Sequence, residues 1–189
     1  MESLHFTVDS MTQLPNFFAF LPRMEIALNE GSGALLCFDI KELSALNEAR
    51  GRTAGDFVIK SLARVLSAPP ARDRSPTREE CDERKERDQE PWENAPGRSS
   101  VFRTGGDEFV VLLPGTSEGK ARELGVRLER QFRADLQASG IEVAGLHTAV
   151  VTYPVGDGSL SELLVAMGVA WNGRGLGTAT MPPWGIRVL

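Results

Sequence analysis

Residues 101–113 read Val101-Phe102-Arg103-Thr104-Gly105-Gly106-Asp107-Glu108-Phe109-Val110-Val111-Leu112-Leu113 and predict a β-hairpin. The residues on either side of the glycines have high strand propensity. Two adjacent glycines between such runs indicate a tight turn, because a positive φ costs glycine little. Asp107 and Glu108 place two carboxylates at the tip, whereas a turn needs at most one such residue to bond its own backbone. Acids beside a glycine that admits a ligand to the backbone suggest a cation and a phosphate, although a solvated hairpin tip explains Gly-Gly-Asp alone equally well.

The composition of the 189 residues is that of one globular domain with a substantial core. Hydrophobic residues make up 41% of the chain, charged residues 25%, and the net charge is −5. This acidity disfavours nucleic acid and anionic membrane as partners, and no apolar run approaches the ~20 residues of a membrane span. Met1 to Asp9 lack the pattern of a signal peptide. Cys37 and Cys81 form no disulfide or metal-binding pattern, so we expect a reducing, cytoplasmic setting.

The chain before the hairpin predicts a helix, a buried strand and two further helices. Apolar residues recur at helical spacing from Phe17 to about Asn29, with Pro22 as a kink or an alternative start. The continuous apolar run Ala34–Ile40 is typical of a strand buried on both faces. Its acid, Asp39, lies near the carboxyl end, where it is either accessible to a ligand or the cap of the next helix.

Two motifs resemble the signatures of the GGDEF family, the diguanylate cyclases. The first is the pentapeptide Gly-Gly-Asp-Glu-Phe at 105–109. The second is the family pattern Asp-x-Asp-x-Phe-Lys-x-x-Asn-Asp-x-x-Gly-His-x-x-Gly-Asp after the first strand. Residues 39–56 keep its first acid, asparagine, both glycines and last acid in register, at Asp39, Asn47, Gly51, Gly55 and Asp56. The opening at 9–16 is similar to the family's Asp-x-Leu-Thr-Gly-Leu-x-Asn, with Met11 and Gln13 as departures. The chain is thereby identified as a partly degenerate member of this family.

Residues 68–99 predict a charged, flexible insertion within a single GGDEF-like domain spanning 1–189. The segment is rich in proline and mixed charge and poor in aliphatic residues, so it cannot bury enough apolar surface to offset the entropy of ordering. GGDEF domains often carry an Arg-x-x-Asp inhibitory product site here. The corresponding residues are Pro96 and Ser99, so the resemblance predicts no inhibitory site.

The chain after the hairpin predicts a helix to about Ala138, a strand within 141–153, a helix capped by Ser159, and a final strand over 184–189. His147, alone in the strand run, is interpreted as a packing residue. The order β-α-α-β-β-α-β-α-β predicts an α+β fold whose sheet contains antiparallel pairs and has helices on one face. The resemblance implies a ferredoxin-like sheet similar to the adenylyl cyclase and polymerase palm, with the GGDEF hairpin at the active site.

The resemblance also implies the roles of individual residues. Asp39, the carbonyl of Ile40 and Asp107 would hold Mg²⁺ (or Mn²⁺), and Asp107 and Glu108 would be catalytic. The implied substrate contacts are Asn47 and Asp56 to guanine, Gly105 and Gly106 beside the nucleotide, and Arg174 in place of a C-terminal lysine. The implied partners are GTP, a second subunit in a catalytic homodimer, and a possible regulatory protein.

The phosphate contacts depart from the family pattern. Ser44 replaces a lysine that reaches the terminal phosphates, and Thr178 replaces an arginine. Lys41, in place of the family's second acid, could restore some charge. Two functions therefore stay open: a diguanylate cyclase that condenses two GTP into cyclic di-GMP, and a degenerate module that binds GTP or a protein without turnover. A nucleic-acid polymerase palm is disfavoured by the acidic charge.

Overall fold

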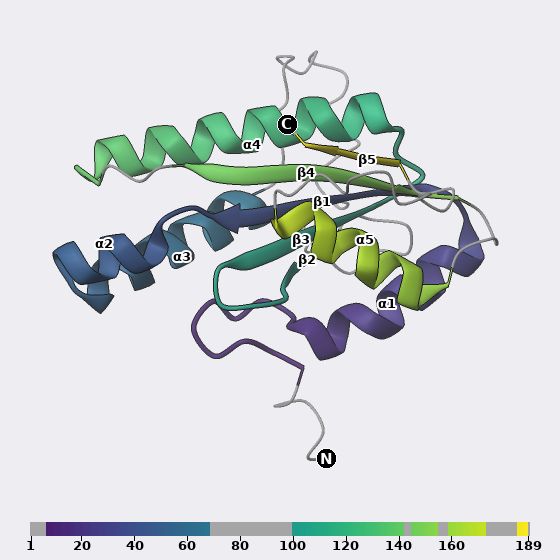
Figure 1. The fold of residues 1–189 in the computed structure, drawn as a ribbon, viewed down its shortest axis with the longest axis horizontal. Coiled ribbons are helices and arrows are strands. Elements are labelled where there is room, and N and C mark those ends of the chain that lie inside the picture. Colours follow the sequence, from purple (N-terminus) through teal and green to yellow (C-terminus); the bar gives the residue numbers. More distant parts are fainter. Residues whose placement is uncertain (1–6, 69–99, 142–144, 155–158, 173–184, 189) are drawn as a thin grey trace, which may run out of the picture.

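The computed structural model describes residues 7–68, 100–141, 145–154, 159–172 and 185–188. Helices and strands follow one another in the predicted order, and the helix predicted from Phe17 comes first (Figure 1). In chain order they are α1 (Phe17–Glu30), β1 (Gly33–Ile40), α2 (Leu43–Arg50), α3 (Arg52–Ser67), β2 (Ser100–Arg103), β3 (Glu108–Pro114), α4 (Glu118–Ala138), β4 (Leu146–Tyr153), α5 (Leu160–Asn172) and β5 (Gly185–Val188).

The five strands form one sheet in the order β2-β3-β1-β4-β5, and every neighbouring pair is antiparallel. The predicted α+β class is confirmed. Strand β1 lies at the centre and pairs with β3 on one side and β4 on the other. Its continuous apolar run is buried along its length except at Asp39, as expected of a central strand.

Helices cover both faces of the sheet, so the expectation of helices on one face was wrong. Figure 1 shows α4 and α5 on opposite sides of β1 and β4. Alternate β1 residues point to opposite faces. Leu36 and Phe38 join a core with α2, α3 and α4, whereas Leu35 and Cys37 join a core with α1 and α5. A strand that is apolar at successive positions needs cover on each face, and these two helix groups provide it.

The helix ends follow from local sequence. The Asn16 side chain accepts hydrogen bonds from the backbone of Phe18 and Ala19, which fixes the start of α1 there. Pro22 lies inside α1, so the alternative start at this proline was wrong. The hydroxyl of Ser159 accepts from the N–H of Glu162, and the Glu162 carboxylate accepts from the N–H of Ser159. This reciprocal capping box confirms Ser159 as the cap of α5.

Some of the predicted features fall outside the described residues. These include the insertion over 68–99 apart from Ala68, and both Arg174 and Thr178. In the described part of the chain, no helix combines the length and hydrophobicity needed to span a membrane.

Candidate active site

Three polar side chains form a row across the sheet near the carboxyl end of β1. Asp39 is in register with Glu108 of β3 on one side and with His147 of β4 on the other. Directly opposite residues of antiparallel strands share a face and have β-carbons about 5 Å apart. Alternation puts this row on the face that carries Cys37 and, deeper in the sheet, the core formed with α1 and α5. The structure thus gives His147 a neighbour that its interpretation as a packing residue did not anticipate.

The carboxylates of this row repel one another. Burial raises the pKa of Asp39, the charge of Asp107 raises it further, and the charges of His147 and Lys41 oppose this rise. Burial likewise raises the pKa of Glu108, and the charges of Asp107 and Asp39 raise it further. The three acids predicted from the sequence therefore lie within electrostatic reach of each other. Their uncompensated charge makes the end of β1 a place where a cation is favoured.

The hairpin turn occupies residues 104–107, and Glu108 begins β3 instead of lying at the tip. The backbone N–H groups of Thr104 and Gly105 both donate to the carbonyl of Glu108, at 2.9 and 3.3 Å. Neither Gly105 nor Gly106 has a positive φ, so the turn does not need glycine for that reason. A β-carbon at Gly105 would instead collide with the carboxylate of Glu108. Gly105 therefore leaves the space that this side chain occupies.

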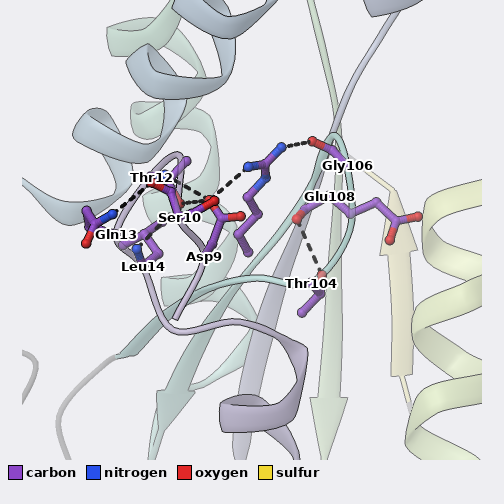
Figure 2. Close-up of polar contacts among 9 residues, drawn as sticks. Asp9, Ser10, Thr12, Gln13, Leu14, Thr104, Gly106 and Glu108 are labelled. Atoms are coloured by element: carbon purple, nitrogen blue, oxygen red, sulfur yellow. Dashed lines mark hydrogen bonds and ion pairs between the residues drawn. The ribbon is translucent and has the colours of Figure 1, made fainter. Parts of the chain in front are cut away.

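A partly buried arginine attaches the turn to the start of the chain (Figure 2). The Nη2 atom of Arg103 donates to the carbonyl of Gly106 at 2.6 Å, and its Nη1 atom donates to Oδ1 of Asp9 at 2.8 Å. Its backbone N–H donates to the carbonyl of Pro15 at 2.9 Å. Only 10% of the Arg103 side chain is exposed, so this ion pair is shielded from solvent and salt.

Asp9 is itself held by a local turn. The backbone N–H and the hydroxyl of Thr12 donate to the same Oδ1 atom, at 2.8 and 2.7 Å. Burial alone would raise the pKa of Asp9, but the hydrogen bonds from Thr12 and Arg103 lower it below its ordinary value. The carboxylate thus stays charged and keeps Arg103 in place. The sequence carried Asp9 and Thr12 as part of the opening motif, but nothing local indicated their connection to the hairpin.

The residues at the end of β1 fit a hard divalent cation. The N–H of Ile40 donates to the carbonyl of Asp107 at 3.3 Å, so the backbone of Ile40 faces the hairpin turn. In an antiparallel ladder the N–H and C=O of one residue point to the same side, which directs the Ile40 carbonyl toward Asp107. No group of three or more His, Cys, Asp and Glu side chains within the described ranges is arranged to hold a metal. Mg²⁺ accepts such a sparse protein contribution because it keeps waters and binds substrate phosphates.

The predicted base-binding residues lie on the neighbouring helices α2 and α3. Oδ1 of Asn47 is buried and has no hydrogen-bond partner among the described residues. A β-carbon at Gly55 would collide with this atom, so Gly55 lets the amide pack against α3. Asp56 follows directly and is half-buried. Gly51 joins the two helices with a φ of 83°, in the left-handed region that favours glycine. The structure therefore explains why glycine occupies both positions of the second motif: Gly51 has a positive φ, and Gly55 leaves space for Asn47.

Comparisons with known proteins agree with this geometry. The sequence model described as "Diguanylate cyclase, GGDEF domain" matches residues 6–78. The chain is 26% identical over 163 residues to the bifunctional diguanylate cyclase/cyclic di-GMP phosphodiesterase MucR of Pseudomonas aeruginosa, covering 83% of this chain and 20% of that protein. It is 32% identical over 131 residues to the diguanylate cyclase DgcP of the same species, covering 67% of this chain and 16% of DgcP. A sensory box/GGDEF family protein from Caulobacter crescentus has a similar structure, with a TM-score of 0.55, 26% identity, and coverage of 88% of this chain and 96% of that chain.

An antiparallel sheet with acids where its central strand meets a hairpin defines an α+β domain with the GGDEF fold. With the sequence similarities, this fold makes the chain a member of the GGDEF family. The chain spans a fifth or less of the length of these two curated relatives, covering 20% and 16% of them.

Proposed function

We propose that this domain is a nucleotidyltransferase that condenses two GTP molecules into cyclic di-GMP, with one GTP held by each subunit of a homodimer. The observation that carries the proposal is the meeting of Asp39, Asp107 and Glu108 at the end of β1, where burial and then the neighbouring carboxylates raise the pKa values of Asp39 and Glu108. Such mutual repulsion opposes folding unless a ligand offsets it, which is typical of a functional site.

In this proposal the acids divide the work. Asp39, Asp107 and the Ile40 carbonyl would hold Mg²⁺ or Mn²⁺, which when bound supplies positive charge at the α-phosphate and acidifies the attacking hydroxyl. The raised pKa of Glu108 suits a carboxylate that accepts the proton of the 3′-hydroxyl. The 3′-oxygen then bonds to the α-phosphorus of the partner's GTP, and the bond to pyrophosphate breaks. Two such attacks close the ring.

Guanine selection is assigned to Asn47 and Asp56. The buried Oδ1 of Asn47 lacks a donor among the described residues, and a bound purine could provide one. A carboxylate at Asp56 accepts well from the N1–H and exocyclic amine of guanine. Adenine lacks this pair of donors, so we expect GTP to bind in preference to ATP.

A second candidate is a regulatory module that binds GTP or a protein without turnover. The observation that favours it is Ser44, an exposed neutral residue of α2 where the family resemblance expects a lysine. Without this cation the triphosphate would be held less tightly, since hydrogen bonds to charged groups contribute about 1.5–3 kcal/mol each.

The experiment that separates these candidates is incubation of the protein with GTP and Mg²⁺, followed by chromatography for cyclic di-GMP and pyrophosphate. Because two loaded subunits must meet, the initial rate should rise more than linearly with protein concentration when the dimer is weak. ATP should give no product. Binding of GTP with no product at any protein concentration would favour a regulatory module that binds GTP. Absence of GTP binding would overturn the cyclase and favour a module that binds a protein partner.

A further inference from the structure

The backbone ladder of β1 continues one residue beyond the strand and carries a lysine into the acid site. The N–H of Ile40 points to β3 and donates to Asp107, whereas the N–H of Lys41 points to β4 and donates to the carbonyl of Gly145 at 3.1 Å. This alternation puts Lys41 in step with Asp39, two positions earlier. The side chains of Lys41 and Asp39 therefore lie on the same face of the sheet, two positions apart along the chain.

Lys41 is available to a ligand. It is exposed, and the ion pairs among the described residues do not include it. Arg103, the other cation close to the turn, is already engaged with Asp9 and Gly106 and is largely buried. His147, which lies opposite Asp39 on β4, has its Nε2 atom buried. Lys41 is thus exposed to solvent and unpaired among the described residues, so its ammonium group can contact a ligand.

The position of Lys41 suits a phosphate better than a pair with the nearby acid. Lys41 forms no ion pair with Asp39 in the described part of the chain, so its ammonium group can contact a phosphate without breaking such a pair. A nucleoside triphosphate approaching three carboxylates meets strong repulsion, and each cation at the site reduces it. A lysine on a long stem can follow a phosphate chain, because it needs no fixed bidentate geometry.

We propose that Lys41 binds the phosphate groups of the nucleotide at the end of β1. This assignment rests on the proposed function, because it takes GTP as the ligand. It places a phosphate-binding cation directly after β1, in the same part of the chain as Ser44. The resemblance to the family expects a lysine at Ser44 on α2, and Lys41 would supply that positive charge from the end of a strand.

The test uses two probes that share guanine and differ in phosphate. One is α,β-methylene-GTP, whose α–β bridge cannot break, and the other is guanosine. We expect Lys41→Ala to weaken binding of the triphosphate analogue about tenfold and to leave guanosine unchanged. Lys41→Arg should retain most of the affinity, and the difference between wild type and Lys41→Ala should shrink as salt screens the charge. Lys60→Ala, at an exposed position of α3, is the matched control and should change neither affinity.

The outcomes separate this inference from the proposed function. If the wild type binds the analogue and Lys41→Ala binds it equally well, the role of Lys41 is wrong while GTP binding stands. Equal losses for guanosine and the analogue would also overturn it, because they would show damage to the base site. If the wild type binds neither probe, both the proposed function and the role of Lys41 fail.

Discussion

The candidate site has two halves, the acids at the end of β1 and the helix pair α2 and α3, and each half lacks a different kind of partner. The acid row, with Asp39 and Glu108, is held rigidly by strand pairing but carries more negative charge than its surroundings neutralise. The helix pair that carries Asn47 and Asp56 has a buried carbonyl oxygen with no donor among the described residues. One half lacks a cation and the other lacks a hydrogen-bond donor.

Under the proposed function, this difference assigns one part of the nucleotide complex to each half. A guanine nucleotide with its divalent ion offers both missing groups, because the ion brings positive charge and the base brings donors. The acid row should therefore control chemistry and the helix pair should control nucleotide choice. Variants in the two halves should differ in which measured quantity they change.

The largest expected effect is that of Asp39→Asn. Removing this carboxylate takes away a proposed metal ligand, so turnover should fall by at least about a hundredfold. The metal-free variant should nevertheless melt at the same temperature as the wild type or a few degrees higher, because repulsion with Asp107 and Glu108 is relieved. Product formation and thermal unfolding check the two statements. A variant that melts well below wild type would show that Asp39 supports the fold.

The next effect concerns the attachment of the hairpin. Arg103→Ala breaks a shielded ion pair and leaves Asp9 without its partner, so the free energy of unfolding should fall by about 2–3 kcal/mol. Arg133→Ala is the control, because Arg133 pairs with Glu129 on the exposed surface of α4 and should matter by less than ~0.5 kcal/mol. Urea unfolding of both variants measures the difference. Equal losses would mean that Arg103 does not fix the hairpin.

A smaller effect tests the helix pair. Gly55→Ala would push a β-carbon into Asn47, so the preference for GTP over ATP should drop about tenfold in a binding titration. Gly119→Ala is the matched change in α4, where the added carbon meets no atom within 4 Å. It should stabilise the protein by about 0.5–1 kcal/mol, since alanine favours a helix over glycine. Retained nucleotide preference in Gly55→Ala would remove Asn47 from base recognition.

The smallest effect is a pH dependence of the metal-free protein. The pKa values of Asp39 and Glu108 are raised on folding, so the folded state binds more protons than the unfolded chain. The contribution of these two groups to stability should therefore rise as pH falls from neutral through their pKa values in the folded state. It should level off below their pKa values in the unfolded chain, near about 4. Asp9, whose pKa is lowered, acts in the opposite direction at lower pH. Melting temperatures of wild type and Asp39→Asn, taken with a chelator present, measure the difference. The prediction would be contradicted if the melting temperature of the wild type fell between pH 7 and pH 5 as much as that of Asp39→Asn.

Much of the fold was predictable because local patterns decide local structure. The apolar stripe of α4 and the cap of α5 identified their helices, and the run Ala34–Ile40 identified the central strand. The same run also implied cover on both faces, so the expectation of helices on one face ignored a signal that the sequence held. The acids of the site were predictable because two motifs fixed their spacing.

The rest depended on contacts between distant parts of the chain. The ion pair of Arg103 with Asp9 joins residues 94 positions apart, and no local pattern indicates it. His147 looked like a packing residue because its strand is apolar, and strand register alone places it beside Asp39. The sequence explained glycine at position 105 by a positive φ in the turn. The structure shows that φ is not positive there, and that a β-carbon would meet the carboxylate of Glu108.

The central position of β1 has a consequence for how the chain folds. Asp39 pairs with Glu108 and His147, which follow it far along the sequence, so β1 gains its neighbours late. Long-range pairing of this kind slows folding, because the chain loses loop entropy before the contacts form. During synthesis β1 would emerge well before either partner strand, as an apolar segment with two unpaired edges, which favours aggregation. A fragment ending before β4 should therefore be poorly soluble, and the row of Asp39, Glu108 and His147 can form only after both β3 and β4 have paired with β1.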